Sequence, residues 1–209
     1  MSDYKDYGFR ESGPAHTFQY LQQPLLDMLG GNTNRRILDL GCGNGYLVNF
    51  LISQGYDAYG TDASEMGIEI ARQSHPDRFY VQDLSTDKLP LELQNKQFDT
   101  ILSTEVIEHL YDPAGFIEFC KASLIPGGEL IISTPYHGYF KNLLLSILGK
   151  WDTHMDPSWY GGHIKMWSKN TLSKALTTAG FNVTHFTGCG RFPYFYKSMI
   201  IKAKLAPAK

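Results

Sequence analysis

The sequence predicts an α/β fold of the doubly wound kind, with helices on both faces of an open, mostly parallel sheet. Short apolar segments alternate with helical segments over the first two thirds of the chain, as in right-handed βαβ units. A glycine-rich turn follows the first of these apolar segments. The chain has 209 residues, 43% apolar and 19% charged, enough for one well-filled core and short for two. We therefore expect a single domain over residues 1–209.

The first elements follow from the spacing of apolar residues. Residues 1–34 are expected to form a helical cover, because apolar residues recur at helical spacing between 14 and 29, although Pro24 indicates a kink or a second start. Five strands are expected at residues 36–40, 56–61, 79–82, 97–103 and 129–134, the last one after a turn at residues 126–128. Helices are expected after the first, second and fourth strands, the third of these helices starting at Pro113.

The alternation breaks at residues 135–167, which are far longer than a usual connection. Long segments at the carboxyl edge of such a sheet often cover the substrate, so we expect a substrate lid here. A helix capped by Ser168 or Asn170 and ended by Gly180 follows. Two apolar strands, near 181–187 and 194–203, complete the chain.

Composition narrows the function classes. Nineteen Lys and Arg against 21 Asp and Glu give a charge of -2, which disfavours a nucleic-acid partner. The three cysteines form no C-x-x-C pair, and no apolar run reaches the length of a membrane span, so a cytoplasmic protein is expected. Asp152, His154, Asp156 and His163 match no closed zinc pattern, and no metal is expected.

The segment ILDLGCGNGYLVNFL is the most informative one. Glycines after the first strand of an open parallel sheet let the backbone approach a ligand beyond the strand ends. Here Asp39 precedes a G-x-G-x-G turn of Gly41, Gly43 and Gly45. This spacing differs from the G-x-G-x-x-G that places a diphosphate on a helix N-terminus, so it favours a ligand without one.

Two acidic residues extend this pattern. Asp62 ends the second strand, about twenty residues after the turn, where a carboxylate typically binds the ribose hydroxyls of an adenosine. Asp83 and Leu84 follow the third strand, where a carboxylate can accept from an adenine amine and an apolar neighbour can cover the ring.

These motifs, followed in order by FDTILSTEVIEHL and LIPGGELIIST, resemble the class I S-adenosylmethionine-dependent methyltransferases, in particular the branch of the ubiquinone-biosynthesis O-methyltransferases. The resemblance covers residues 35–135 closely and the last forty residues moderately. It implies a seven-stranded sheet with the last strand antiparallel beside the sixth, S-adenosylmethionine as cofactor with S-adenosylhomocysteine as product, and O-methylation of a small molecule. It also implies that the methionine part lies against Asp39, Gly41, Gly43 and Gly45, the ribose against Asp62 and Ala63, the adenine against Asp83 and Leu84, and the reactive end against Thr104.

A hydroxyl acceptor must lose a proton, and histidine is the usual base. His109 follows the fourth strand, while His137, His154 and His163 lie in the lid; His163 is slightly preferred over His137 and His109. Each of them is also open to a structural role. Glu105 and Glu108 are expected to cap a turn or to face solvent, and Cys42 to fill space in the glycine turn.

Two further segments carry expectations about contacts. Residues 139–151 place apolar residues on one helical face between Lys141 and Lys150, so this helix either packs on the core or touches a membrane surface. Tyr4, Tyr7 and His16 are candidates for covering the cofactor or simply the surface.

Other functions stay open on the sequence. A nicotinamide-dependent oxidoreductase would use the same turn and Asp62, although the spacing disfavours it and no Tyr-x-x-x-Lys pair occurs. A nucleic-acid amino methyltransferase is disfavoured because STEV, after the fourth strand, lacks a Pro-Pro-aromatic clamp. A cofactor-binding protein without catalysis is the alternative from another class.

Overall fold

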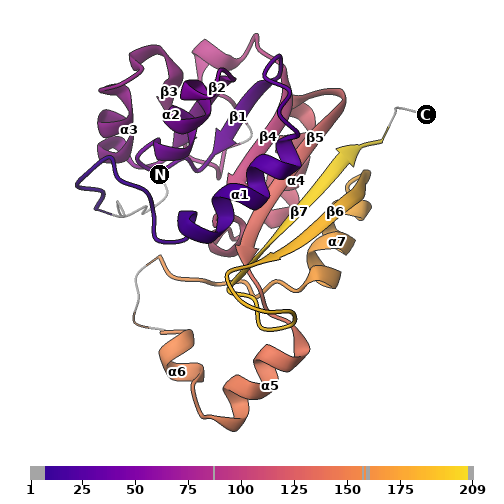
Figure 1. Cartoon of the computed structure of the whole chain (residues 1–209). Coiled ribbons are helices and arrows are strands. Elements are labelled where there is room, and N and C mark those ends of the chain that lie inside the picture. Colours follow the sequence, from indigo (N-terminus) through magenta and orange to yellow (C-terminus); the bar gives the residue numbers. More distant parts are fainter. Residues whose placement is uncertain (1–7, 87, 157, 159–160, 207–209) are drawn as a thin grey trace.

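A seven-stranded sheet forms the centre of the protein in the computed structural model, which describes residues 8–86, 88–156, 158 and 161–206. The strand order is β3-β2-β1-β4-β5-β7-β6 (Figure 1). Strands β1 to β5 are parallel, and β7 lies antiparallel between β5 and β6, as predicted. The strands are β1 (Arg36–Leu40), β2 (Asp57–Asp62), β3 (Phe79–Val81), β4 (Phe98–Thr104), β5 (Leu124–Pro135), β6 (Phe181–Cys189) and β7 (Ser198–Leu205).

Helices cover both faces of this sheet. The α-helices are α1 (Phe18–Leu29), α2 (Tyr46–Ser53), α3 (Glu65–Arg72), α4 (Pro113–Ser123), α5 (Tyr139–Ile147), α6 (Trp151–His154) and α7 (Lys169–Thr178), and the short 3-10 helices are η1 (Pro76–Arg78), η2 (Leu91–Leu93) and η3 (Ile107–His109). Ile37 of β1 packs in a core with α1, α2 and α3, whereas Leu38 packs in a second core with α4 and α7. Successive residues of a strand point to opposite faces, so β1 is buried on both sides.

The strand order reverses at β1, which has β2 on one side and β4 on the other. In a doubly wound sheet the crevice for a ligand lies beyond the carboxyl ends of the strands at this position. The glycine-rich turn between β1 and α2 is therefore at the expected ligand position.

Three local predictions need correction or completion. A single helix α1 runs through Pro24 without a second start. The turn expected at residues 126–128 lies inside β5, where Gly127 has a φ of 75° and the pairing with β4 shifts between Phe98 and Thr100. The Pro-Gly-Gly segment therefore lies within β5, next to an irregularity in the pairing of β5 with β4. The last strand starts at Ser198 rather than near 194.

The start of α7 illustrates how the sequence specifies a helix end. Ser168 is the N-cap: its Oγ accepts from the Thr171 backbone N–H, and the Thr171 Oγ1 accepts from the Ser168 N–H. This reciprocal capping box decides between Ser168 and Asn170.

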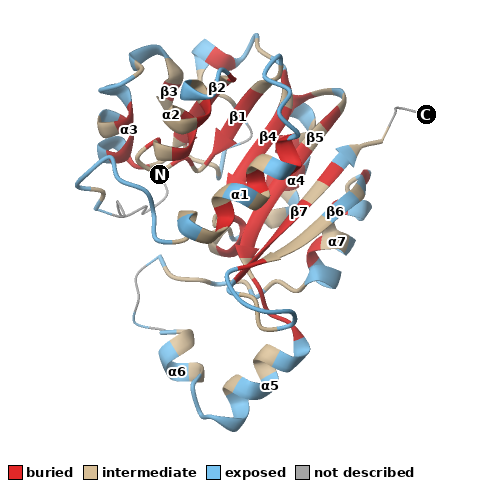
Figure 2. Ribbon diagram, viewed as in Figure 1, coloured by how far each residue is buried: buried red, intermediate tan, exposed pale blue. Residues whose placement is uncertain are grey.

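The expected lid leaves the sheet at the end of β5 and forms a separate lobe with α5 and α6 (Figure 1). None of the residues of these two helices is buried, so α5 does not pack on the core (Figure 2). The chain returns beside its point of departure, where the His137 N–H donates to the Trp167 carbonyl at 2.9 Å. Within the part of the chain that the structure describes, no helix is both long enough and apolar enough to cross a membrane.

Candidate functional site at the carboxyl edge of the sheet

The glycine turn is held tightly against the end of β2. The backbone N–H groups of Gly41 and Cys42 both donate to the Thr61 carbonyl, at 2.8 and 2.9 Å. Gly41, Gly43 and Gly45 have φ values of 84°, 55° and 75°, in the left-handed region that favours glycine. A side chain at any of the three would strain the turn.

Each of these glycines faces a different side chain. A Cβ atom on Gly41 would overlap Val106, which follows β4. A Cβ on Gly43 would lie 2.8 Å from Cζ of Phe9, and one on Gly45 would overlap Ala71 of α3. The glycines therefore allow three close contacts within the protein, besides any approach of a ligand to the turn.

Asp39 stands out electrostatically at the end of β1. Its side chain is fully buried, and neither carboxylate oxygen has a hydrogen-bond partner among the described residues. Burial raises its pKa to about 8, and the nearby Asp62 contributes to the same shift. A buried, unpartnered carboxylate is unfavourable unless a donor or cation binds it. The carboxylate of Asp39 is thus suited to a ligand that carries ammonium or hydroxyl donors.

Asp62 ends β2 and organises the next turn. One of its carboxylate oxygens accepts from the Gly43 N–H and the other from the Ser64 N–H, both at 2.8 Å. Ser64 in turn caps α3 by accepting from the Gly67 N–H at 2.9 Å. The carboxylate of Asp62 therefore lies next to the glycine turn, although nineteen residues separate it from Gly43.

The remaining expected cofactor residues end neighbouring strands of the same edge. Ala63 follows β2, and Asp83 and Leu84 lie just after β3, where the Asp83 side chain accepts from the Ser85 N–H at 2.9 Å. Thr104 is the last residue of β4. The parallel order of β3, β2, β1 and β4 brings these ends together, because parallel strands have their carboxyl ends on one side.

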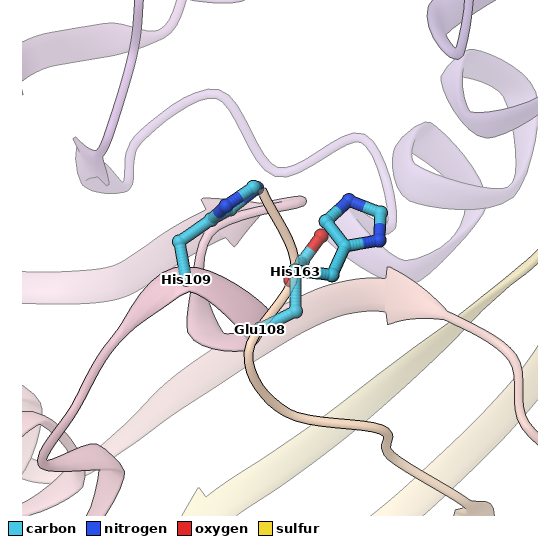
Figure 3. Close-up of side chains that lie close together, drawn as sticks. All are labelled: Glu108, His109 and His163. Atoms are coloured by element: carbon cyan, nitrogen blue, oxygen red, sulfur yellow. The ribbon is translucent and has the colours of Figure 1, made fainter. Parts of the chain in front are cut away.

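A second group of side chains lies beyond β4, where the lid meets the sheet. Glu108 and His109 belong to η3, and His163 comes from the returning part of the lid (Figure 3). The rings of His109 and His163 meet edge to face with centroids 4.9 Å apart. Each of the three residues offers one ligand atom, and these atoms lie within 4.8 Å of one another. Among the described residues this is the one cluster able to hold a cation, and it differs from the four residues weighed in the sequence.

The tautomer of His109 follows from its partners. Its Nδ1 lies 2.7 Å from the Gly161 carbonyl oxygen and 3.2 Å from that of Gly162. Since carbonyl oxygens only accept, Nδ1 carries the proton and Nε2 carries the lone pair. Burial lowers the pKa of His109, and these two hydrogen bonds partly offset the effect. The pKa of His163 falls to about 4, through burial first and then through His109.

Of the two roles expected for Glu105 and Glu108, capping a turn or facing solvent, solvent exposure is wrong, because neither residue is exposed. Glu108 is fully buried and accepts from the Thr134 hydroxyl at 2.9 Å, while its other carboxylate oxygen has no partner among the described residues. Burial, and then Glu105, raise its pKa to about 8. The Glu108 carbonyl also accepts from the N–H groups of Ile164 and Lys165, at 2.9 and 3.0 Å. These contacts fasten the lid to η3.

The side chain of Glu105 has partners from two strands that are distant in the sequence. It has a φ of 56°, which is rare for a residue with a side chain, and burial raises its pKa. Its carboxylate accepts from the Ser133 hydroxyl at 2.7 Å and from the Ser198 hydroxyl at 3.0 Å. These partners come from β5 and β7, so only the tertiary pairing of the strands reveals them.

His137 and His154 form a second histidine pair, with ring centroids 5.4 Å apart. His137 is buried, and its Nδ1 lies 3.3 Å from the Asn142 side-chain oxygen. Burial, followed by the charge of Lys141, lowers its pKa to about 4. The Lys141 ammonium donates to the Tyr136 carbonyl at 2.7 Å, so it faces inward. Tyr4 and Tyr7 lie outside the described residues, and His16 is exposed.

The relatives with curated names that this chain resembles include ubiquinone biosynthesis O-methyltransferases. The ubiquinone biosynthesis O-methyltransferase of Acinetobacter baumannii is 28% identical over 184 residues, 85% of this chain and 77% of the relative. The enzyme of the same name from Chelativorans sp. is 35% identical over 162 residues, 73% of this chain and 61% of the relative.

Solved structures share the fold. The magnesium protoporphyrin IX methyltransferase from Synechocystis PCC 6803, with bound SAH, superposes with a TM-score of 0.67 at 21% identity, covering 88% of this chain and 81% of that one. An S-adenosylmethionine-dependent methyltransferase from Mesorhizobium loti gives a TM-score of 0.67 at 21% identity, covering 87% and 96%.

The family model described as a methyltransferase domain matches residues 15–186, most of the chain. This range holds the glycine turn, all the predicted cofactor residues and the Glu108, His109 and His163 cluster. The chain therefore belongs to the methyltransferase domain family and has the fold of its S-adenosylmethionine-dependent members.

Proposed function

We propose that the protein transfers the methyl group of S-adenosylmethionine to a hydroxyl group of a small molecule, with His109 as the base. The observation that carries the proposal is the fixed tautomer of His109, whose Nε2 is left basic at the junction of sheet and lid. The relatives named ubiquinone biosynthesis O-methyltransferases support an oxygen acceptor.

The residues present fit this cofactor. The unpartnered carboxylate of Asp39 is suited to the ammonium group of the methionine part, and Asp62 to the ribose hydroxyls. Asp83 and Leu84 are assigned to the adenine, and Ala63 to the ribose wall. Gly41, Gly43, Gly45 and Thr104 complete the set of cofactor residues.

S-adenosylmethionine supplies a methyl group that its sulfonium already activates. The task of the protein is then to align the acceptor oxygen with that methyl group, to exclude water and to remove the hydroxyl proton. The oxygen–carbon bond forms as the carbon–sulfur bond breaks, and the proton passes to Nε2 of His109. Because the Nδ1 proton remains bonded to the Gly161 carbonyl, the resulting imidazolium is stabilised.

The three candidate histidines differ in base strength. The pKa values of His137 and His163 fall to about 4, so both are weak bases at neutral pH. His109 has two carbonyl acceptors that oppose this shift. We therefore assign the proton transfer to His109 and a supporting contact to His163, which reverses the slight preference for His163 from the sequence.

The test compares His109→Gln with His163→Gln and His137→Gln. Transfer of a tritiated methyl group from S-adenosylmethionine to material extracted from a cell lysate measures catalysis, and calorimetry with S-adenosylhomocysteine measures cofactor binding. Loss of a general base is expected to lower the rate about 10²- to 10⁴-fold for His109→Gln, with unchanged cofactor affinity. His137→Gln is expected to retain most of the rate.

A chelator separates two roles for the cluster. If EDTA abolishes transfer and a divalent cation restores it, Glu108, His109 and His163 hold a metal, and the proposal of His109 as the general base is wrong. If cofactor binds but no extract yields labelled product, the protein is a binder without this activity.

We also propose that α5 touches a membrane surface and admits a lipid-soluble acceptor. Its apolar side chains stay exposed: Tyr139, Phe140, Leu143, Leu144 and Ile147 are 42 to 75% exposed. The loop between β6 and β7 adds Phe192 and Tyr194, and the Tyr194 ring packs on Phe140 at 5.7 Å. Of Lys141 and Lys150, only Lys150 is exposed. The proposed attraction of α5 to a membrane surface therefore rests on apolar area more than on charge.

Liposome sedimentation tests this contact. Leu144→Asp is expected to reduce the fraction bound to phosphatidylcholine vesicles with about one fifth anionic lipid. Leu91→Asp is the matched control, because Leu91 is 80% exposed but belongs to η2, not to α5 or the loop between β6 and β7. If the wild-type protein does not sediment, or if both variants behave alike, α5 does not bind membranes.

A further inference from the structure

Residues 8–15 form a strap that leads into α1 and runs along the glycine turn (Figure 1). Within residues 8–16 the side chain of Phe9 is the partly buried one, and the others are exposed. The strap therefore approaches the sheet through one aromatic ring.

The ring of Phe9 lies between two glycines of different elements. A Cβ on Gly43 would lie 2.8 Å from Cζ of Phe9, and a Cβ on Gly67 would lie 3.0 Å from its Cδ2. Gly43 belongs to the turn after β1, and its N–H donates to Asp62; Gly67 belongs to the first turns of α3. The ring of Phe9 therefore packs against Gly43, whose backbone N–H donates to the Asp62 carboxylate.

Asn44 holds the strap in place. Its side-chain Nδ2 donates to the carbonyl oxygens of Glu11 and Gly13, both at 2.8 Å, and its Oδ1 accepts from the Tyr46 N–H at 3.3 Å. Asn44 stands between Gly43 and Gly45, so both donor hydrogens of a residue in the turn are used on the strap backbone.

Ordering the backbone of the strap costs about 1–2 kcal/mol per residue, which the two hydrogen bonds from Asn44 and the partly buried ring of Phe9 offset only in part. A ligand that touches both the turn and the strap would decide whether the strap stays docked.

We propose that Asn44 is a positioning residue for cofactor binding, which clips residues 11–13 so that Phe9 closes the adenosyl-cofactor pocket over the glycine turn. The inference rests on the proposed placement of the cofactor at Asp39, Asp62 and the turn. Binding then orders the strap, and strap contacts slow the release of the cofactor.

The test uses Asn44→Asp, which keeps the size and the acceptor for Tyr46 but removes both donors to the strap. We expect the dissociation constant for S-adenosylhomocysteine, measured by calorimetry, to rise about 10-fold. The rate of methyl transfer at saturating S-adenosylmethionine is expected to change less than about twofold, because the clip does not touch the reacting atoms. Phe9→Ala is expected to act alike without adding charge, and Ser12→Ala, exposed between the two clipped carbonyls, to have no effect.

Limited trypsin digestion gives a second readout. Arg10 lies in the strap and is exposed, so cleavage after Arg10 reports strap opening by the loss of residues 1–10 in the mass spectrum. S-adenosylhomocysteine is expected to slow this cleavage in the wild-type protein and in Ser12→Ala, but not in Asn44→Asp or Phe9→Ala.

The variant Asp62→Ala distinguishes a failure of the inference about the strap from a failure of the proposed cofactor placement. If Asp62→Ala weakens cofactor binding while Asn44→Asp and Phe9→Ala leave affinity and protection unchanged, the strap has no part in binding and the inference is wrong. If Asp62→Ala also leaves the affinity unchanged, the cofactor lies elsewhere and the proposed placement is wrong.

Discussion

At the residue scale, the three glycines of the turn are required by internal contacts as well as by backbone conformation. Gly45 combines both: its φ is 75°, and a Cβ there would overlap Ala71 and lie 2.7 Å from the Phe79 ring. Gly31 has a similar φ of 70°, but a Cβ there would meet nothing within 4 Å. Comparing substitutions at Gly31 and Gly45 therefore separates the cost of backbone strain from the cost of steric overlap.

Gly31→Ala is expected to lower the free energy of unfolding by about 1 kcal/mol, from left-handed strain alone. Gly45→Ala is expected to lower it by about 3 kcal/mol or more, because α3 and β3 must also shift. Urea denaturation followed by circular dichroism measures both values. Equal losses for the two variants would contradict the overlap at Gly45.

Asp39 makes a prediction about pH. Its pKa is about 8 in the folded protein against 3.8 ordinarily, so the folded state binds the proton more tightly than the unfolded state. The contribution of the protonated Asp39 carboxyl group to folding stability is therefore fully present below about pH 4 and is lost as the pH rises through about 8. Asp39→Asn carries no such charge and should gain stability relative to the wild type over this window, on the order of 2–4 kcal/mol.

Urea midpoints at several pH values between about 4 and 9, compared for Asp39→Asn and the wild type, measure this difference. The comparison cancels groups that titrate alike in both proteins. A difference independent of pH would show that the carboxylate of Asp39 is not destabilised by burial. The variant is also expected to lose cofactor affinity, because the same charge is assigned to the methionine ammonium.

At the element scale, α7 depends on local signals that the sequence displays. Ser168→Ala removes the hydroxyl that accepts from Thr171 and is expected to lower the free energy of unfolding by about 1 kcal/mol. Asn170→Ala, inside the first turn of the helix, is the control and should change stability little. Thermal denaturation of both variants measures these losses of stability. A larger loss for Asn170→Ala than for Ser168→Ala would contradict the assignment of Ser168 as the N-cap.

η3 shows the opposite case at this scale. It spans Ile107–His109 only, too short for apolar periodicity to predict which residues face inward. Glu108 is buried because its carbonyl receives two N–H groups from the returning lid and its carboxylate receives the Thr134 hydroxyl. Contacts with residues that are distant in the sequence set its environment.

At the scale of the whole molecule, cofactor binding couples to global stability. A ligand that binds only the folded state stabilises it by about 2.7 kcal/mol at a concentration of about 100 times its dissociation constant. For a domain of this size S-adenosylhomocysteine should then raise Tm by about 5–10 °C, whereas NAD should leave it unchanged. Differential scanning fluorimetry measures both; a rise with NAD alone would favour the oxidoreductase alternative.

The sequence by itself determined the sheet and the row of residues at its edge. Short apolar segments, a glycine turn and acidic residues at strand ends are local signals, and parallel strands place their carboxyl ends on one side. These signals suffice to assign Asp39, Gly41 and Asp62 to one edge. The pairing of the sixth and seventh strands followed only from the resemblance, because two terminal apolar runs do not reveal which neighbour each one pairs with.

Tertiary structure alone decided which distant side chains meet. It joined Glu105 to Ser133 and Ser198, brought His163 against His109, turned Lys141 inward and laid Phe9 on Gly43. None of these pairs has a sequence signature, because each depends on where a loop or lid returns to the sheet. The physical reason is that non-local contacts are set by packing and chain closure, whereas helix caps, strands and glycine turns are set by neighbouring residues.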